Sequence, residues 1–390
     1  MSGSRSAPAA TDDVVLVAGE ASGDAHGAAL ARALGTLAPD VRLTGMGGAA
    51  MAAAGVRLLH RAERVAVVGG TEAVSRLPAI WRAFRGLRRL LRQARPGVLV
   101  LVDFPEFNLR LARAARRLDV PVVYFVAPQV WAWRRGRLRA MARDVSRVLA
   151  IFPFEVALYQ EAGVPVEFVG HPVLDALPAL GRVEARAGLA EPGERLVGLL
   201  PGSRDAELRH HLPVLLPAAR ALAVSEPGLR FALPVAATLD PRSVRAAVVT
   251  AGVPVAVLRG QAHRVMAAAD LLLVASGTAT LEAACYGTPM VVLYRLSGVS
   301  YRVARLLVRG IPGISLPNIV AGRPVVPELI QEQATPEHLA RTALALLRDE
   351  AARAAQRAAL LEVRARLGSG GAGLRAAAAV LRERDGHARR

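Results

Sequence analysis

The residues best suited to chemistry lie where candidate β-strands end in small polar turns. Segment Leu271–Tyr294 reads as a buried strand, the turn Ser276-Gly277-Thr278, a short helix carrying Glu282, and a second buried strand. Such a turn directs the N–H groups of a helix start to one point, which suits a phosphate. Glu282 lies about one turn into the helix, where a carboxylate can accept both hydroxyls of a ribose. These residues predict a nucleotide-sugar site, the alternative being an ordinary strand–turn–helix.

A second turn of this kind follows the candidate strand Leu196–Leu200. It contains Gly202 and Ser203, whose N–H groups can bind an anion, and Arg204, whose guanidinium can neutralise a leaving diphosphate. Two anion-binding turns in one sheet indicate a diphosphate more specifically than either turn alone.

The first half of the chain has a carboxylate-rich cluster at residues 103–108 (DFPEFN), directly after the strand Val98–Val102. Its two acids and its amide can hold a polar acceptor. Asp103 follows five apolar residues, so we expect partial burial to raise the pKa of its carboxyl toward that of a useful general base. The alternative is that Asp103 or Asn108 caps the next helix.

Ligands of open α/β sheets bind beyond the carboxyl ends of the strands, which gives two more clusters weight. The strand Val14–Ala18 is followed by residues 19–24 (GEASGD), whose glycines allow close approach of a ligand and whose Ser22 or Asp24 can instead cap a helix. Residues 124–134 (YFVAPQVWAWR) bring aromatic rings that suit a sugar face or an acyl chain, or that pack in the core.

These turns need parallel sheets to position them. Short apolar strands alternate with helices throughout, which predicts two doubly wound α/β domains with a cleft between them, joined near Asp175–Gly193, and a helical tail from Pro336. The predicted strands are Val14–Ala18, Val41–Gly45, Val98–Val102, Val122–Val126, Val148–Ile151, Val166–Val169, Leu196–Leu200, Phe231–Val235, Val253–Leu258, Leu271–Ala275 and Met290–Leu293.

Composition restricts the classes of function. The chain has 390 residues and a net charge of +18, but every basic residue is Arg and aromatic residues make up 4%, so we expect no nucleic-acid partner. The first strand is not followed by G-x-G-x-x-G, which disfavours a dinucleotide oxidoreductase. One cysteine, Cys285, and eight scattered histidines predict no metal site and no cofactor. We expect neither a secretory signal nor a transmembrane helix.

A basic amphipathic pattern runs over Leu77–Arg92. Apolar residues recur at helical spacing and arginines fill the remaining positions, which fits either a helix that docks on a membrane or one that packs on the sheet with an Arg-rich outer face. The residues that we expect to face a membrane are Trp81, Phe84, Arg85 and Arg88.

Taken together, these residues resemble the lipid-A-disaccharide synthases, glycosyltransferases with the GT-B fold of two Rossmann-like domains. The resemblance implies an N-terminal domain at 1–178, a UDP-sugar-binding domain at 179–345 and a helical tail at 346–390. The matching motifs, in order, are AGEASGD at 18–24, GMGG at 45–48, DFPEFN at 103–108, PQVWAWR at 128–134, FPFE at 152–155, VGHP at 169–172, LPGSR at 200–204, SGTATLE at 276–282, LPN at 316–318 and PELIQ at 327–331.

The resemblance implies transfer of 2,3-diacylglucosamine from UDP to 2,3-diacylglucosamine 1-phosphate with inversion, as in lipopolysaccharide synthesis of Gram-negative bacteria. It implies a monomer or homodimer in the cytoplasm, peripherally bound to inner-membrane phospholipid. The resemblance also implies that Asp103 and Arg204 are catalytic residues. The implied nucleotide-sugar residues are Gly202, Ser203, Arg204, Ser276, Gly277, Thr278, Glu282, Asn318, Glu328 and Gln331, and the implied acceptor residues are Glu20, Ser22, Gly23, Asp24, Glu106, Asn108, Gln129 and Trp131.

Two alternatives remain at this stage. One is another GT-B activity on a UDP-sugar, either an undecaprenyl-linked N-acetylglucosamine transferase or a UDP-sugar epimerase. Segments 103–108 and 128–134 argue against both. The other is a basic membrane-bound binding protein without turnover, although the presence of Asp103 and Arg204 disfavours it.

Overall fold

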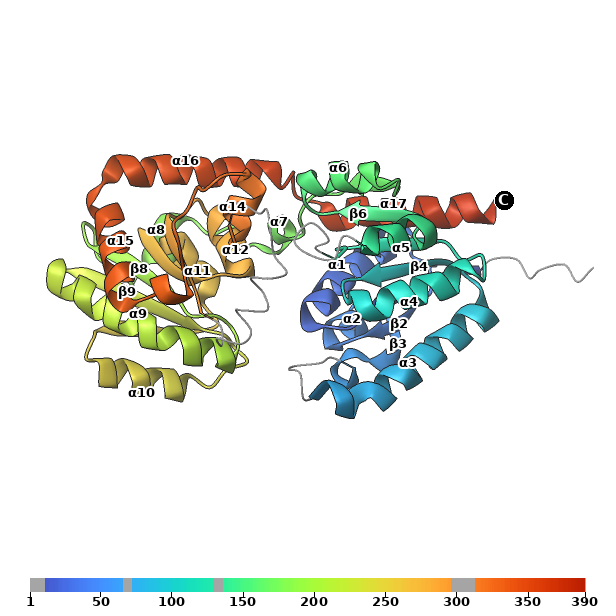
Figure 1. The fold of residues 1–390 in the computed structure, drawn as a ribbon, viewed down its shortest axis with the longest axis horizontal. Helices are drawn as coiled ribbons and strands as arrows, with labels where there is room; N and C mark the ends of the chain where they lie inside the picture. The colour runs from blue at the N-terminus through green and yellow to red at the C-terminus, as the bar shows by residue number, and fades with distance from the viewer. Residues whose placement is uncertain (1–10, 66–71, 129–135, 296–312, 390) are drawn as a thin grey trace, which may run out of the picture. The chain divides into compact units, whose positions relative to one another are not determined.

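The structure is a computed structural model that describes residues 11–65, 72–128, 136–295 and 313–389. The chain divides into two compact units (Figure 1). Unit 1 contains residues 1–175 together with 367–390, and unit 2 contains residues 176–366. The chain therefore leaves unit 1, builds unit 2 from one continuous segment, and returns to finish unit 1.

Unit 1 is built on a seven-stranded parallel sheet with strand order β3-β2-β1-β4-β5-β6-β7. Its strands are β1 (Thr11–Ala18), β2 (Leu43–Gly47), β3 (Arg57–Arg61), β4 (Pro96–Val102), β5 (Val122–Phe125), β6 (Arg147–Ala150) and β7 (Val166–Phe168). Its helices are α1 (Ala21–Leu37), α2 (Ala49–Ala53), η1 (Ala62–Arg64), α3 (Glu72–Ala94), α4 (Pro105–Arg116), α5 (Arg137–Asp144), α6 (Pro153–Glu161) and α17 (Ala372–Ala388).

Unit 2 is built on a six-stranded parallel sheet with strand order β10-β9-β8-β11-β12-β13. Its strands are β8 (Arg195–Leu200), β9 (Leu229–Val235), β10 (Val255–Arg259), β11 (Leu271–Ala275), β12 (Met290–Tyr294) and β13 (Glu328–Ile330). Its helices are α8 (Arg182–Arg186), α9 (Asp205–Ser225), α10 (Pro241–Ala251), α11 (Ala262–Ala268), α12 (Thr278–Cys285), α14 (Leu316–Ala321), η2 (Gln331–Gln333), α15 (Pro336–Arg348) and α16 (Glu350–Arg366), and α7 (Val173–Ala176) spans the junction of the units.

Central strands such as β4 and β11 are buried along their whole length because helices cover both faces of each sheet. In β4, Leu99 and Leu101 pack in a cluster with α3 and α4, while Val98 and Val100, on the other face, are also fully buried. Successive side chains of a strand point to opposite faces, so a strand buried on both sides reads as a continuous apolar run. This arrangement brings the polar carboxyl ends of neighbouring strands to one edge of each sheet.

The predicted α/β architecture is confirmed, and each predicted strand overlaps an observed one. The prediction missed the edge strands β3 and β13. β3 alternates between exposed and half-buried residues, and β13 has three residues, so neither shows the apolar run of a covered strand. The helical tail expected at 346–390 belongs to both units: α16 is part of unit 2, and α17, which follows the glycines at 368–371, packs on α1 and β4 of unit 1.

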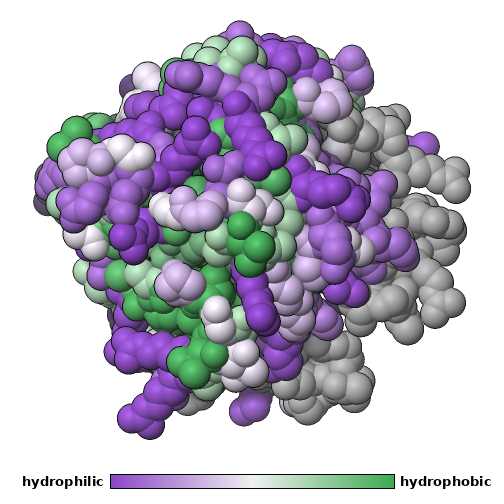
Figure 2. Space-filling model, turned by 90° about the vertical axis from the view of Figure 1, so that its left-hand side faces the viewer, coloured by the Kyte–Doolittle hydropathy of each residue, from purple (hydrophilic) through white to green (hydrophobic). Residues whose placement is uncertain are grey.

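Figure 2 views the molecule from the side on which Figure 1 draws α9, α10 and α15, and it shows a mostly hydrophilic surface with smaller apolar areas. Among the helices that the structure describes, none is both long and apolar enough to cross a membrane.

Candidate functional site

The carboxyl end of the unit 2 sheet holds a cavity of about 440 Å³. This volume lies within the range of about 300–1,000 Å³ that is typical of small-molecule sites. Turns after β8 and β11 form its wall together with α11 and the end of β12. Seven predicted donor-binding residues line it, namely Gly202, Ser203, Arg204, Ser276, Gly277, Thr278 and Glu282. The two turns singled out in the sequence therefore meet at one site.

The β11–α12 turn leaves the start of α12 open to this cavity. The Ser276 N–H donates to the Leu293 carbonyl of β12 at 2.9 Å, and the Thr280 hydroxyl donates to the Gly277 carbonyl at 2.7 Å. Both bonds fix the turn from behind. The first N–H groups of a helix have no intrahelical acceptor, so those of Thr278 and Ala279 suit an anion in the cavity.

Glu282 lines the same cavity from α12, and its contact with a ribose stays a prediction. Burial raises the pKa of its carboxyl, and the nearby His263 acts against this rise. His263 lies on α11, and its ring centroid is 6.3 Å from that of Tyr286. Its Nδ1 atom is buried without a hydrogen-bond partner in the described part of the chain.

The β8–α9 turn differs from the prediction in one respect: its backbone N–H groups already donate hydrogen bonds to a carboxylate of the protein itself. Glu207 Oε2 accepts hydrogen bonds from the N–H groups of Ser203 at 2.7 Å and Arg204 at 3.2 Å. The predicted donation of the Ser203 N–H to a ligand therefore competes with Glu207. Arg204 itself has a side chain that is 78% exposed, and its Nη1 lies 3.7 Å from Glu207 Oε1.

Asn318, Glu328 and Gln331 do not line this cavity. Asn318 is buried, and its amide bonds to Glu328 and to the backbone of Val325 and Val326. Glu328 also accepts from the backbone N–H groups of Ile314 and Ser315, both at 2.9 Å. Ile314 in turn accepts from the Ser276 hydroxyl at 3.2 Å, so Asn318 and Glu328 support the β11–α12 turn from a distance. Gln331 begins η2 after β13.

In unit 1, Asp103 lies at the carboxyl end of β4 in a left-handed backbone conformation (φ 49°), and the next residue, Phe104, has the same φ. Left-handed non-glycine residues are uncommon, and each costs about 1–3 kcal/mol. Burial raises the pKa of the Asp103 carboxyl, as predicted, while a hydrogen bond from the Phe104 backbone opposes the rise. The carboxylate is therefore more basic than a solvated one.

Two buried side chains hold this strained turn. The Tyr124 hydroxyl and the Asn108 amide both donate to the Asp103 carbonyl at 2.7 Å. Asn108 has no exposed surface, and its other acceptor is the Val102 carbonyl. Its predicted role in acceptor binding is corrected here, because a side chain sealed in the interior positions Asp103 and does not reach a ligand in this conformation.

The segment after β1 meets the Asp103 turn because β1 and β4 are neighbours in the sheet. A Cβ atom on Gly23 would lie 3.8 Å from the Asp103 Cβ, and one on Gly19 would lie 2.2 Å from the Phe104 ring. Glycine is required for this approach at position 19, whereas the distance at position 23 is an ordinary van der Waals contact. Glu20 and Ser22 are exposed at the start of α1.

Asp24 is buried, and its predicted role in acceptor binding is also corrected. Its two oxygens accept from the backbone N–H groups of Gly48 at 2.7 Å, Ala50 at 3.0 Å and Met51 at 3.0 Å. It therefore caps α2, and not the helix α1 that contains it. An ionised carboxylate has about four acceptor sites. Three of them are used here by backbone donors at the start of α2, so the side chain stabilises that helix start in this structure.

Of the three remaining predicted acceptor residues, the structure describes only Glu106. Glu106 is exposed on α4 and forms an ion pair with Arg137 of α5. Gln129 and Trp131 lie outside the described residues.

The predicted membrane-facing residues of α3 have two different environments. The Trp81 side chain is 55% exposed, and the Arg85 guanidinium lies over its ring at 3.5 Å. Phe84, in contrast, packs edge-to-face on Phe107 at 5.7 Å, and Phe107 stacks on Phe104 of the Asp103 turn. Phe84 thus belongs to the aromatic row behind that turn. Arg88 is exposed and lies 6.0 Å from the Phe84 ring.

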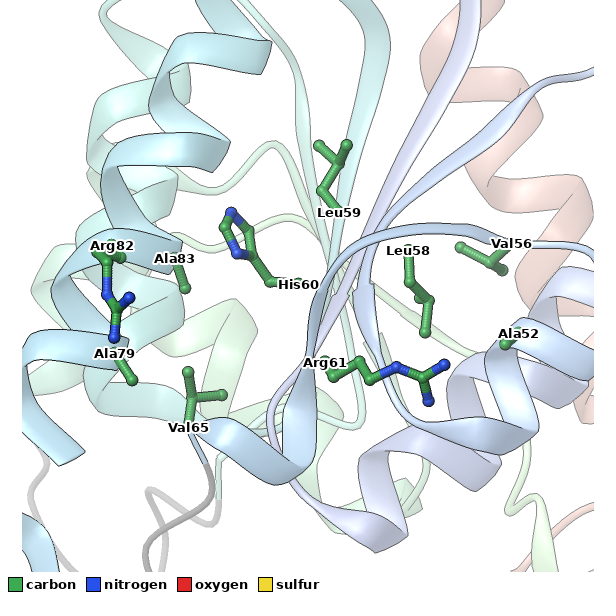
Figure 3. A pocket seen from close by; sticks show the side chains of 10 residues that line it. All are labelled: Ala52, Val56, Leu58, Leu59, His60, Arg61, Val65, Ala79, Arg82 and Ala83. Atoms are coloured by element: carbon green, nitrogen blue, oxygen red, sulfur yellow. The ribbon is translucent and has the colours of Figure 1, made fainter.

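A pocket of about 570 Å³ separates α3 from the edge strand β3 (Figure 3). In this view His60 points from β3 toward Ala83 of α3, whereas Arg61 points to the other side of the strand, toward Ala52. Burial lowers the pKa of the His60 imidazole. Most of the lining is apolar, and His60, Arg61 and Arg82 are its basic members.

Several residues at these sites went unpredicted. Glu207 stands three residues after Arg204, a spacing typical of a capping box, so the sequence could have predicted its contact with the turn. Tyr294 ends β12 and lines the cavity. His211 is buried, with Nδ1 2.7 Å from the Pro201 carbonyl and Nε2 accepting from the Arg295 N–H at 3.3 Å, and no sequence signal indicated this. Within the described ranges, no cluster of three or more His, Cys, Asp or Glu could hold a metal ion.

Comparison with solved structures agrees with this architecture. UDP-GlcNAc 2-epimerase from Neisseria meningitidis bound to UDP-GlcNAc superposes with a TM-score of 0.59 at 13% identity, over 88% of this chain and 94% of that one. A spinosyn rhamnosyltransferase complexed with thymidine diphosphate gives 0.55 at 19% identity, over 91% and 95%. Two parallel α/β units of this kind define the fold class of the chain as GT-B.

Sequence comparison identifies the family within that class. A model of the lipid-A-disaccharide synthetase family matches residues 14–379. The lipid-A-disaccharide synthases of Anaeromyxobacter dehalogenans (strain 2CP-1) and Myxococcus xanthus are 45% and 44% identical over 377 and 371 residues, which cover 96% and 94% of this chain and 98% and 96% of those proteins. The chain belongs to the lipid-A-disaccharide synthase family, and it is a glycosyltransferase that forms a lipid A disaccharide from a UDP-sugar and a sugar acceptor.

Proposed function

We propose that the enzyme transfers 2,3-diacylglucosamine from UDP-2,3-diacylglucosamine to the 6-hydroxyl of 2,3-diacylglucosamine 1-phosphate, with inversion at the anomeric carbon. The observation that carries this proposal is the half-buried Asp103, whose raised pKa and fixed backbone suit a general base. The cavity of unit 2, with its two turns and Glu282, supports the UDP half of the donor.

The reaction is a single in-line displacement. Asp103 accepts the proton of the 6-hydroxyl as its oxygen bonds to the anomeric carbon, and the bond from that carbon to the diphosphate oxygen breaks. The electron pair leaves with UDP, whose charge the N–H groups at the start of α12 and the Arg204 guanidinium stabilise. Glu282 accepts the ribose hydroxyls. For this, the diphosphate must displace Glu207 from the β8–α9 turn or bind beside it.

Both substrates carry acyl chains, so we assign the enzyme to the cytoplasmic face of the inner membrane. The exposed Trp81 and Leu77 of α3, 55% and 56% exposed, support this assignment as the apolar contact with lipid. Phe84 is not part of that contact, because it packs inward on Phe107.

The test is an assay of the purified enzyme with both substrates and EDTA, analysed by mass spectrometry for products and by NMR for the new anomeric linkage. A β-1,6-linked disaccharide 1-phosphate and an equal amount of UDP are expected. An α-linkage contradicts the single displacement, and UDP release without disaccharide points to another acceptor. Folded protein that binds UDP without any turnover favours a binding protein.

A further inference from the structure

A groove of about 510 Å³ runs between α3 and α4 on the side of α3 away from the pocket of Figure 3. Phe84, Ala114 and Leu118 form its apolar part, and no acidic residue lines it. Its remaining lining consists of seven exposed arginines, which are Arg85, Arg88, Arg89 and Arg92 of α3 and Arg110, Arg113 and Arg117 of α4 and its C-terminus. We call these residues the arginine groove.

Some arginines elsewhere in the described chain form ion pairs. Arg42, Arg147 and Arg382, for example, pair with acids at 2.6–2.8 Å. None of the seven groove arginines forms an ion pair with any described acid. Other exposed arginines of the described chain, such as Arg32 and Arg57, also form no ion pair. The groove is distinguished by the seven arginines that gather in one lining without an acidic residue among them.

This arrangement also opposes the stability of both helices. Arg85 and Arg89, like Arg113 and Arg117, stand four residues apart, where like charges repel by about 0.2–0.5 kcal/mol per pair. A bound anion removes that repulsion. Guanidinium groups that converge from two helices are well suited to the oxygens of a phosphate ester.

We propose that the arginine groove binds the phosphate headgroup of an anionic phospholipid at the membrane surface. The groove lies beside the exposed Trp81 on the same helix, so a lipid headgroup in the groove and lipid around Trp81 can be contacted together. A nucleic acid fits less well, because the Arg85 guanidinium covers the ring face on which a base would stack. The inference rests on the membrane assignment proposed above and adds its headgroup specificity.

The test compares binding of the full-length enzyme to phosphatidylcholine vesicles with and without phosphatidylglycerol. The variant Arg110→Gln/Arg113→Gln lies on α4, outside the predicted apolar contact. Each basic residue at an anionic surface contributes about a fivefold factor, so we expect about 30-fold weaker binding to phosphatidylglycerol vesicles. The control Arg32→Gln/Arg57→Gln removes the same charge from exposed positions outside the groove and is expected to change binding about twofold or less.

Several outcomes overturn the proposal. Equal losses in the two double variants show that net charge alone acts, and no loss in either shows that the groove does not contact lipid. Inorganic phosphate that binds the wild type but not Arg110→Gln/Arg113→Gln, together with equal vesicle binding by the two proteins, assigns the groove to free phosphate. Loss of oligonucleotide binding without loss of vesicle binding assigns it to nucleic acid. Turnover of detergent-dispersed substrates, measured in parallel, is expected to stay unchanged. An error in the proposed lipid site can therefore be distinguished from an error in the proposed reaction.

Discussion

The β4–α4 turn of unit 1 and the β8–α9 and β11–α12 turns of unit 2 all follow central parallel strands, yet they are built differently. Asp103 is half-buried in a left-handed conformation, and two buried side chains donate to its carbonyl. Arg204 is 78% exposed beside an open cavity. The first turn fixes one carboxylate, whereas the others present several groups to a space that a ligand can fill. A general base needs a fixed position, and a diphosphate needs donors that can adjust to it.

The largest effect should come from the fixed carboxylate. Asp103→Asn keeps the shape of the side chain but removes the base, so kcat should fall about a thousandfold. The thermal midpoint should change little, because the hydrogen bonds of the turn go to the Asp103 backbone carbonyl. Steady-state kinetics checks this, with Asp40→Asn, at an exposed position outside the predicted site, as the control. A kcat near that of wild type would remove Asp103 from the mechanism.

On the side of the cavity, Arg204→Ala should lower kcat/KM by a factor on the order of 100, since it removes a cation from the leaving diphosphate. Arg209→Ala is the matched control, because Arg209 is exposed on the same helix and does not line the cavity. Isothermal titration with UDP separates binding from catalysis. Equal effects of the two substitutions would contradict the assignment.

The acid limb of the pH profile tests whether Asp103 is as basic as its burial implies. Its pKa is raised, so the carboxylate is protonated and inactive below a pH higher than the ordinary value of about 3.9. At saturating donor, kcat/KM for the acceptor should fall about tenfold per pH unit below that pKa. Circular dichroism at each pH confirms that the protein stays folded. A flat profile down to about pH 4 contradicts a raised pKa.

Loosening the fixed turn should have a smaller effect. Tyr124→Phe removes one of the two donors to the Asp103 carbonyl, so the free energy of unfolding should fall by about 1 kcal/mol and kcat by several-fold. Tyr159→Phe also loses a buried hydroxyl bond, to the Pro128 carbonyl, without touching Asp103. Denaturant unfolding and kinetics of both variants distinguish positioning from stability. A similar drop in kcat for both would argue against a positioning role for Tyr124.

The smallest effect concerns the carboxylate in the open turn. Glu207→Gln keeps an acceptor for the Ser203 N–H but removes a negative charge from the cavity, so the Kd for UDP should fall about threefold. Asp205→Asn makes the same charge change in the first turn of α9 without lining the cavity. Isothermal titration calorimetry compares them. Weaker UDP binding by Glu207→Gln would show that its charge supports the site.

Much of this site was predictable because local patterns determine it. Apolar runs that end in glycine or an acid located the strand ends, and parallel pairing of β8 with β11 and of β1 with β4 then brought the turns together. The individual roles of Asp24 and Asn108 were not predictable. Both are polar residues near strand ends, and their partners, Gly48 and the Asp103 carbonyl, depend on the folded backbone.

Two other predictions, the membrane role of Phe84 and the missed edge strands, failed for a similar reason. Phe84 and Trp81 share one amphipathic pattern, but the position of Phe107 on a neighbouring helix decides that Phe84 packs inward. The strands β3 and β13 escaped prediction because an edge strand needs no apolar run on both faces. Helical periodicity shows which face of a helix is apolar, and it does not show which of those residues a neighbour will cover.

The order of the segments in unit 1 has a consequence for synthesis on the ribosome. The helix α17, which packs on α1 and on the strand β4 that carries Asp103, is made last. Between residue 175 and residue 367 the ribosome adds the 191 residues of unit 2 (366 − 175). At roughly 10 residues per second this takes about 20 seconds. For that time the nascent chain holds all seven strands of the first sheet, but the part of its apolar face that α17 covers over β4 and β5 stays open. Unit 2 can fold as soon as its own segment emerges.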